Sequence, residues 1–332
     1  MSNKPFYASA SSIKLFLSCS LKYYYTKHLK IPEKTNDGAL QGSAAHAVLE
    51  CLLKPRHKKK FDIISKHKTI KKCKVTKRYI RQYIKKVGLP KESFDRIDKF
   101  IVTGVNFDFF CKNGQIVGVE IPFEIGSEED GYFLRGFIDK LVVYKDWHRI
   151  IDFKSSKKLF SGKDLEENLQ GFIYALAVKK MYPEYNLKKV VDFIFLAFPE
   201  DPLQRFPVKN KHVSDEILAG FAEYIKVIYS QMANFRPADR WKNVAANNDP
   251  PKTGEFAGKL LCGFAKQKGQ IKKDGLPYYS CPYRFDQQYY AIIKDGTVIK
   301  TSFAKEDLRP KEGEAIEFKT FGGCERFIKK NP

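Results

Sequence analysis

The sequence is short of acidic residues relative to basic ones. Its 332 residues include 38 Asp and Glu against 60 Lys and Arg, which leaves a formal net charge of +22. A surplus of this size disfavours a basic partner and favours a polyanion such as a nucleic acid. A generally basic proteome, or a need for solubility, would produce the same surplus, so the charge alone leaves these alternatives open.

The chain also lacks any run of eighteen apolar residues, and its first twenty residues lack an apolar stretch of signal-peptide length. We therefore expect a soluble, intracellular protein without membrane association, either cytoplasmic or a viral protein in its host cell. A secreted disulfide framework is excluded by the cysteine pattern, because seven cysteines is an odd number and they are scattered along the chain. They are free thiols, metal ligands, or a mixture of the two.

Apolar residues make up 43% of the chain, enough for a core that needs no disulfides. Their spacing predicts helices over residues 9–21, 40–53, 93–111, 164–180 and 214–232, and strands over 114–125, 132–144, 149–156 and 190–198. A strongly basic segment spans residues 54–86. After residue 235 the chain becomes rich in Pro, Asn and Gly, and a later hairpin turns at Asp295-Gly296. We expect one domain over 1–235, and a linker with a C-terminal extension over 236–332.

Three charged residues interrupt the apolar hairpin of residues 136–156. A two-residue turn at Lys145-Asp146 would place Asp139 directly opposite Asp152, with Lys154 on the same strand face as Asp152. Two facing carboxylates repel unless one takes up a proton or a cation lies between them, and oxygen ligands of this kind suit Mg²⁺ or Mn²⁺. A partly buried salt bridge between Lys154 and one aspartate is the structural alternative.

In their order along the chain, these residues and their surroundings resemble the PD-(D/E)XK nuclease superfamily, and more narrowly its RecB-type exonuclease branch. The resemblance covers roughly residues 9–198. The matching motifs are SASSIKLFLSCSLKYYY, then Gly42 to His46 as G-x-x-x-H, then GFIDKL and IIDFKSSKK, and finally Gln170 and Tyr174 as Q-x-x-x-Y.

The resemblance implies an α/β fold with a restriction-endonuclease-like core and a central mixed β-sheet flanked by helices. Outside the region of resemblance, the residues themselves predict a C-terminal extension containing a small β hairpin. The resemblance also implies roles for individual residues. Asp139, Asp152, the backbone carbonyl of Phe153 and His46 would bind the metal, with Lys154 as the catalytic lysine and His46 alternatively orienting a bound water. Glu120 resembles a further acidic ligand, although strand alternation permits it to face solvent as readily. Gln170 and Tyr174 would hold the substrate strand.

Members of the RecB-type branch often carry one cysteine before the core and three after it, clamping an iron-sulfur cluster. Cys19 fits the first position, whereas Cys262, Cys281 and Cys324 depart from the usual C-x-x-C spacing. These four would suit a [4Fe-4S] cluster or zinc, against the alternative of buried free thiols.

The resemblance as a whole implies a divalent-metal-dependent DNA nuclease. It would be an exonuclease acting on single-stranded DNA ends in DNA replication, recombination or repair. The alternative is a catalytically inactive nucleic-acid-binding protein that retains the fold. The sequence identifies no protein partner.

Overall fold

The structure is a computed structural model that describes residues 5–183, 187–207, 212–245, 262–263, 267–271, 273 and 280–328. The chain forms two compact units. Unit 1 consists of Met1–Ala10 and Thr35–Ser230, and unit 2 consists of Ser11–Lys34 and Gln231–Pro332. Each unit is therefore built from two separate stretches of sequence.

A five-stranded mixed sheet forms the centre of unit 1, with the strands in the order β1-β2-β3-β4-β5. All neighbouring strands are antiparallel except β3 and β4, which run parallel. The strands are β1 (Gln115–Ser127), β2 (Tyr132–Val143), β3 (Trp147–Lys154), β4 (Lys188–Phe195) and β5 (Leu203–Phe206). The parallel pair requires a crossover connection, which the helices between β3 and β4 supply.

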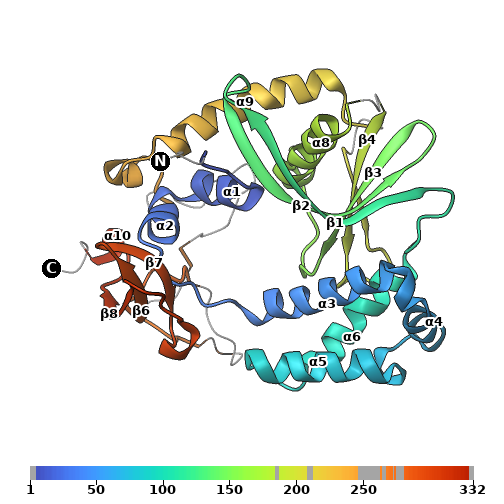
Figure 1. Cartoon of the computed structure of the whole chain (residues 1–332), viewed down its shortest axis with the longest axis horizontal. Helices are drawn as coiled ribbons and strands as arrows, with labels where there is room; N and C mark the ends of the chain where they lie inside the picture. The colour runs from blue at the N-terminus through green and yellow to red at the C-terminus, as the bar shows by residue number, and fades with distance from the viewer. Residues whose placement is uncertain are drawn as a thin grey trace. The chain divides into compact units, whose positions relative to one another are not determined.

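Helices cover both faces of this sheet (Figure 1). The helices of this unit are α3 (Asp37–Leu53), α4 (Lys58–His67), α5 (Lys74–Val87), α6 (Ser93–Asn106), α7 (Lys163–Glu166), α8 (Leu169–Met181) and α9 (Asp215–Ala233), and the last residues of α9 belong to unit 2. The α/β class, with a central mixed sheet flanked by helices, is confirmed.

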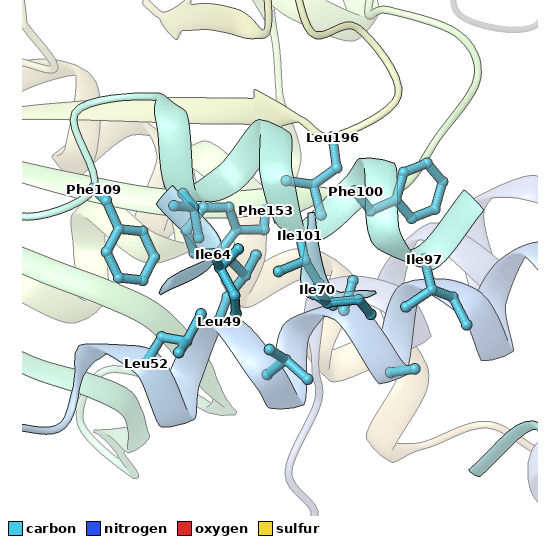
Figure 2. Close-up of a cluster of buried hydrophobic side chains, with 14 of the residues drawn as sticks. Leu49, Leu52, Ile64, Ile70, Ile97, Phe100, Ile101, Phe109, Phe153 and Leu196 are labelled. Atoms are coloured by element: carbon cyan, nitrogen blue, oxygen red, sulfur yellow. The ribbon is translucent and has the colours of Figure 1, made fainter. Parts of the chain in front are cut away.

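A large apolar cluster joins α3, α4 and α6 to one face of the sheet (Figure 2). Leu49 of α3, Ile64 of α4 and Ile101 of α6 are completely buried in it, and Phe153 of β3 meets them from the sheet. At about 25 cal/mol per Å² of buried apolar surface, such side chains each stabilise the fold by about 2 kcal/mol. This packing fixes α3 against the strand that carries Asp152.

Two predicted helices are interrupted in the structure. The 164–180 helix divides into α7 and α8 because the side chain of Asn168 caps α8, accepting a hydrogen bond from Gly171 N at 2.9 Å. The 9–21 helix divides at Cys19, whose backbone is extended. In both places a side chain that accepts a backbone hydrogen bond starts a new helix.

In unit 2, a three-stranded antiparallel sheet in the order β7-β6-β8 packs with short helices. Its elements are α1 (Ala10–Ser18), α2 (Ser20–Tyr23), the π-helical turn Tyr24–His28, β6 (Gln287–Lys294), β7 (Thr297–Ser302), β8 (Ala315–Phe321) and α10 (Glu325–Ile328), with the first residue of α1 in unit 1. β6 and β7 form the predicted hairpin around Asp295-Gly296, and β8 adds a third strand. None of the described helices combines the length and apolar composition needed to cross a membrane.

Candidate active site

The β2–β3 hairpin has the register that the sequence predicts. Tyr144 N donates to Trp147 O at 2.9 Å, and the ladder continues outward to the pair Lys140 and Ile151. The next residues outward are Asp139 and Asp152. Asp139 Oδ2 accepts a hydrogen bond from Phe153 N at 2.8 Å, so the two strands hold this carboxylate against the residue that follows Asp152.

Asp152 is 3% exposed and is held by two residues of α8. Its Oδ1 accepts hydrogen bonds from Tyr174 OH at 2.9 Å and from Gln170 Nε2 at 3.0 Å. Lys154 Nζ lies 2.7 Å from Asp152 Oδ2 and donates to Gln170 Oε1 at 2.6 Å. The approach of Lys154 to Asp152 is a close ion pair without hydrogen-bond geometry, so the buried Oδ2 atom has no hydrogen-bond donor.

A second set of side chains adjoins this network. His46, Glu120 and Asp139 each place one potential ligand atom within 4.8 Å of the others, and among the described residues they form the only such group of three or more. His46 Nδ1 lies 3.4 Å from Asp139 Oδ2. His46 and Glu120 also line a cavity of about 430 Å³ together with Ser155. The group therefore faces a space that a ligand could enter.

Glu120 lies in an irregular part of β1. The register shifts between Ile116 and Gly118, and Glu120 itself has a left-handed backbone with φ of 50°. Its neighbours in β1, Val119 and Ile121, pair with residues on either side of Asp139. Left-handed conformations are costly for residues other than glycine, and they concentrate at functional sites. Simple strand alternation does not predict a left-handed residue inside a strand. For this reason the alternation leaves the orientation of Glu120 open.

Burial and like charges raise the pKa values of both carboxyls in the group. Burial raises the pKa of Asp139 well above its ordinary value, and the neighbouring charges of Asp152 and Glu120 add to the increase. The pKa of Glu120 is raised by burial and then by the charges of Glu50 and Asp152. Burial lowers the pKa of His46, which favours the neutral imidazole that binds metals.

The donor set fits a divalent cation. An imidazole nitrogen and carboxylate oxygens can bind Mg²⁺ or Mn²⁺, and the positive charge would offset the repulsion among these buried acids. Asp152 Oδ2 has no hydrogen-bond donor and is balanced by the ammonium of Lys154 at 2.7 Å. His46, Glu120 and Asp139 are thus the residues that the structure brings close enough to share a metal, and Asp152 lies outside this group of three.

Ser155 is a site residue that the sequence analysis did not identify. A Cβ atom added to Gly42 would lie 2.3 Å from Ser155 Oγ, so only glycine permits this contact between α3 and the end of β3. The contact explains the glycine of the G-x-x-x-H motif, because it brings the His46 helix close to the hairpin. Ser155 also lines a second cavity, of about 710 Å³, with Arg96, Lys154 and Lys157.

In unit 2, Cys19, Cys262, Cys281 and Cys324 line one small cavity of about 20 Å³. Burial and the neighbouring thiols raise the pKa of Cys262 to about 12, and burial raises that of Cys281 to about 11. No three of these sulfurs lie within 4.8 Å of one another, whereas a tetrahedral zinc site with Zn–S bonds of about 2.3 Å brings its sulfurs to about 3.8 Å. Of the remaining cysteines, Cys51 is exposed, and Cys73 and Cys111 are buried in the core of unit 1.

A sheet with helices on both faces, carrying two aspartates and a lysine on adjacent strands, defines the restriction-endonuclease-like class of α/β proteins. The family model of the PD-(D/E)XK nuclease superfamily matches residues 7–246, and the chain belongs to this superfamily. The family implies metal-dependent nuclease activity on a nucleic-acid substrate. A comparison with curated proteins gave no significant match.

Proposed function

We propose that this protein is a divalent-metal-dependent deoxyribonuclease of the RecB-type branch. It degrades single-stranded DNA from its ends, in DNA replication, recombination or repair. The observation that carries the proposal is the adjacency of the His46, Glu120 and Asp139 group to the Asp152–Lys154 pair. The ordered motifs around the hairpin support the RecB-type assignment and the exonuclease activity.

In this proposal His46, Glu120, Asp139, Asp152 and the backbone carbonyl of Phe153 hold Mg²⁺ or Mn²⁺. When bound there, the cation polarises a phosphoryl oxygen and lowers the pKa of a coordinated water. The raised pKa values of Asp139 and Glu120 mean that these carboxyls bind a proton readily until a cation replaces it. His46 Nδ1 lies 3.4 Å from Asp139 Oδ2, which places the imidazole beside the carboxylate that would share the metal with it.

Lys154 is the catalytic lysine. Gln170 Oε1 and Asp152 Oδ2 hold its ammonium group at 2.6 and 2.7 Å, which fixes a positive charge beside the phosphodiester. A fixed charge at that point stabilises the negative charge that develops on the phosphoryl oxygens. The hydrogen bonds of Gln170 and Tyr174 to Asp152 support a positioning role, in addition to the substrate contact predicted for them.

The test is digestion of end-labelled single- and double-stranded DNA by the purified protein with Mg²⁺ or Mn²⁺, and with a chelator as the blank. Asp152→Asn and Lys154→Ala are expected to abolish cleavage while the protein still binds DNA. Lys158→Ala is a matched control, because Lys158 is an exposed lysine four residues further along that does not line either cavity. Cleavage that persists in Asp152→Asn and Lys154→Ala would contradict the proposal.

We further propose that Cys19, Cys262, Cys281 and Cys324 hold a [4Fe-4S] cluster. Their convergence on one cavity supports a group that all four share. No three of their sulfurs lie as close together as the sulfurs around a single zinc ion, which favours a cluster. Protein purified without oxygen should be brown and contain iron and sulfide. Cys281→Ser should lose both, whereas Cys51→Ser, at an exposed cysteine, should keep them. Zinc without iron in the purified protein would contradict the cluster.

A further inference from the structure

The most one-sided charge on unit 1 lies in residues 54–86, which contain 15 Lys and Arg and a single acid, Asp62. These residues include α4 and α5, two helices that pack through their apolar sides against α3 and α6. A helix face that is merely solvated usually carries charges of both signs. Residues 54–86 carry charges of almost one sign only. The packing of α4 and α5 against α3 joins this segment to the helix that carries His46.

Four of these cations form one straight row on α5. Lys74, Arg78, Arg81 and Lys85 are all exposed, and at 100° per residue they fall within about 60° of one another around the helix. The buried residues of the same helix are Thr76, Ile80 and Ile84, and the centre of the row lies about 130° around the helix from their centre. The row is about 16 Å long at a rise of about 1.5 Å per residue, and it faces solvent.

The row is not neutralised by nearby acids. Within the described part of the chain, its four residues form no ion pair, whereas the nearby residues Lys54, Lys58 and Lys71 pair with Glu50, Asp62 and Asp95. Arg81 lies over the ring of Phe94, with its guanidinium carbon 5.8 Å from the ring centroid. This contact supports the flat face of the guanidinium and keeps its position defined.

We propose that the α5 row binds the phosphate backbone of duplex DNA, outside the catalytic cavities. The inference rests on the proposed nuclease function for its substrate class. Proteins that hold single strands combine cations with aromatic rings on which bases stack. The row itself contains no aromatic residue, and the exposed Tyr79 lies about 100° around the helix from Arg78. A row of cations alone suits the regular phosphate backbone of a duplex, which needs no stacking.

The row would then hold the duplex next to a single-stranded end that enters the active site. Each phosphate that a cation neutralises contributes about 0.9 to the salt dependence of duplex binding. Four contacts predict a slope of log K against log salt that is smaller by about 3 to 4 when the row is removed. The affinity at moderate salt should fall at least about tenfold.

The experiment compares the wild type with a variant in which Lys74, Arg78, Arg81 and Lys85 are all replaced by Gln. A matched control replaces four exposed lysines elsewhere in unit 1 by Gln, at positions 112, 145, 188 and 226. Binding to a hairpin duplex and to a single strand of equal length is measured in chelator, over a range of salt. Because no cleavage is required, the measurement is informative even if the nuclease proposal fails.

We expect the row variant to lose duplex affinity at least about tenfold and to change single-strand affinity less than about threefold. The control should keep both affinities close to wild type. A variant that exchanges Lys for Arg and Arg for Lys at the four positions keeps the charge and should bind as the wild type does, which separates charge from folding. An unchanged duplex affinity, an equal loss in the control, or an equal loss on single strands would each overturn the inference.

Discussion

Replacing Asp139 by Asn should make the metal-free protein more stable while it destroys metal binding. Asp139 is a buried acid with Glu120 and Asp152 close by, and its pKa is raised well above the ordinary value by burial and by these charges. Asn keeps a carbonyl oxygen that can accept the hydrogen bond from Phe153 N. The substitution therefore removes the charge and keeps the local geometry.

The size of the effect follows from the separation of the carboxylates. Ligand oxygens of Asp139 and Glu120 lie within 4.8 Å of one another. Two unit charges at that distance repel by about 1 kcal/mol in water and by about 3 kcal/mol at an effective dielectric constant of about 20. Removing one of them should raise the free energy of unfolding by about 1–3 kcal/mol at a pH above the raised pKa of Asp139.

The sign of the pH dependence is set by the raised pKa. In the unfolded chain Asp139 titrates near pH 4, whereas in the folded chain it titrates at a higher pH. Below about pH 4 the carboxyl is protonated in both states, and wild type and Asp139→Asn should have similar stability. As the pH rises through the folded pKa, the wild type loses stability relative to the variant. The advantage of Asn is therefore full only above the raised pKa.

The assay is urea unfolding of chelator-treated protein at several pH values, repeated with Mg²⁺ or Mn²⁺. A cation at one hundred times its dissociation constant should stabilise the wild type by about 2.7 kcal/mol and leave the variant unaffected. Asp146→Asn, at an exposed aspartate in the β2–β3 turn, is the control and should change neither quantity. A variant that is less stable than wild type at a pH above the raised pKa of Asp139, or that the cation stabilises equally, would refute the reasoning.

Three further outcomes are expected. Tyr174→Phe removes a hydrogen bond to the buried Asp152 carboxylate, and such bonds contribute about 1.5–3 kcal/mol. The variant should cleave about 10- to 100-fold more slowly, and its metal affinity is measured in parallel. Gly42→Ala should lower the free energy of unfolding by about 1–3 kcal/mol because the new Cβ meets Ser155, and adding Ser155→Gly should restore it in the same urea assay. Asp139 and Glu120 must lose their protons to bind the cation, and both have raised pKa values. The rate of cleavage by the wild type should therefore fall on acidification at a pH above the ordinary carboxyl pKa of about 4. A pH–rate profile with an inflection near pH 4 would contradict this.

The central hairpin could be predicted in detail because its determinants are local. The Lys145-Asp146 turn fixes the register, and the register alone sets Asp139 opposite Asp152. The position of α3 could not be predicted in this way, because the contact of Gly42 with Ser155 joins residues far apart in the sequence. Short edge strands also escaped prediction, because β5 spans only Leu203–Phe206 and half of its residues are polar.

The order of the motifs along the chain was enough to predict most residues of the candidate site. It was not enough where the backbone departs from regular geometry. Glu120 depends on a left-handed residue inside a strand, and period-two alternation does not anticipate such a residue. The hydrogen bonds from Gln170 and Tyr174 to Asp152 depend on how α8 crosses the sheet, which is a tertiary property. Helix periodicity indicated that the two share a face, without naming the residue they would contact.

The division of unit 2 into two stretches of sequence has a consequence for the order of events during synthesis. All of Thr35–Ser230 is synthesised before the strands β6, β7 and β8. Residues 11–34 therefore cannot pack with these strands until roughly two hundred and fifty further residues have been made. Cys19 accordingly leaves the ribosome long before Cys281 and Cys324. Unit 1 can thus be complete while the four-cysteine cavity is still unformed, so the proposed cluster would enter only after Cys324 has been synthesised.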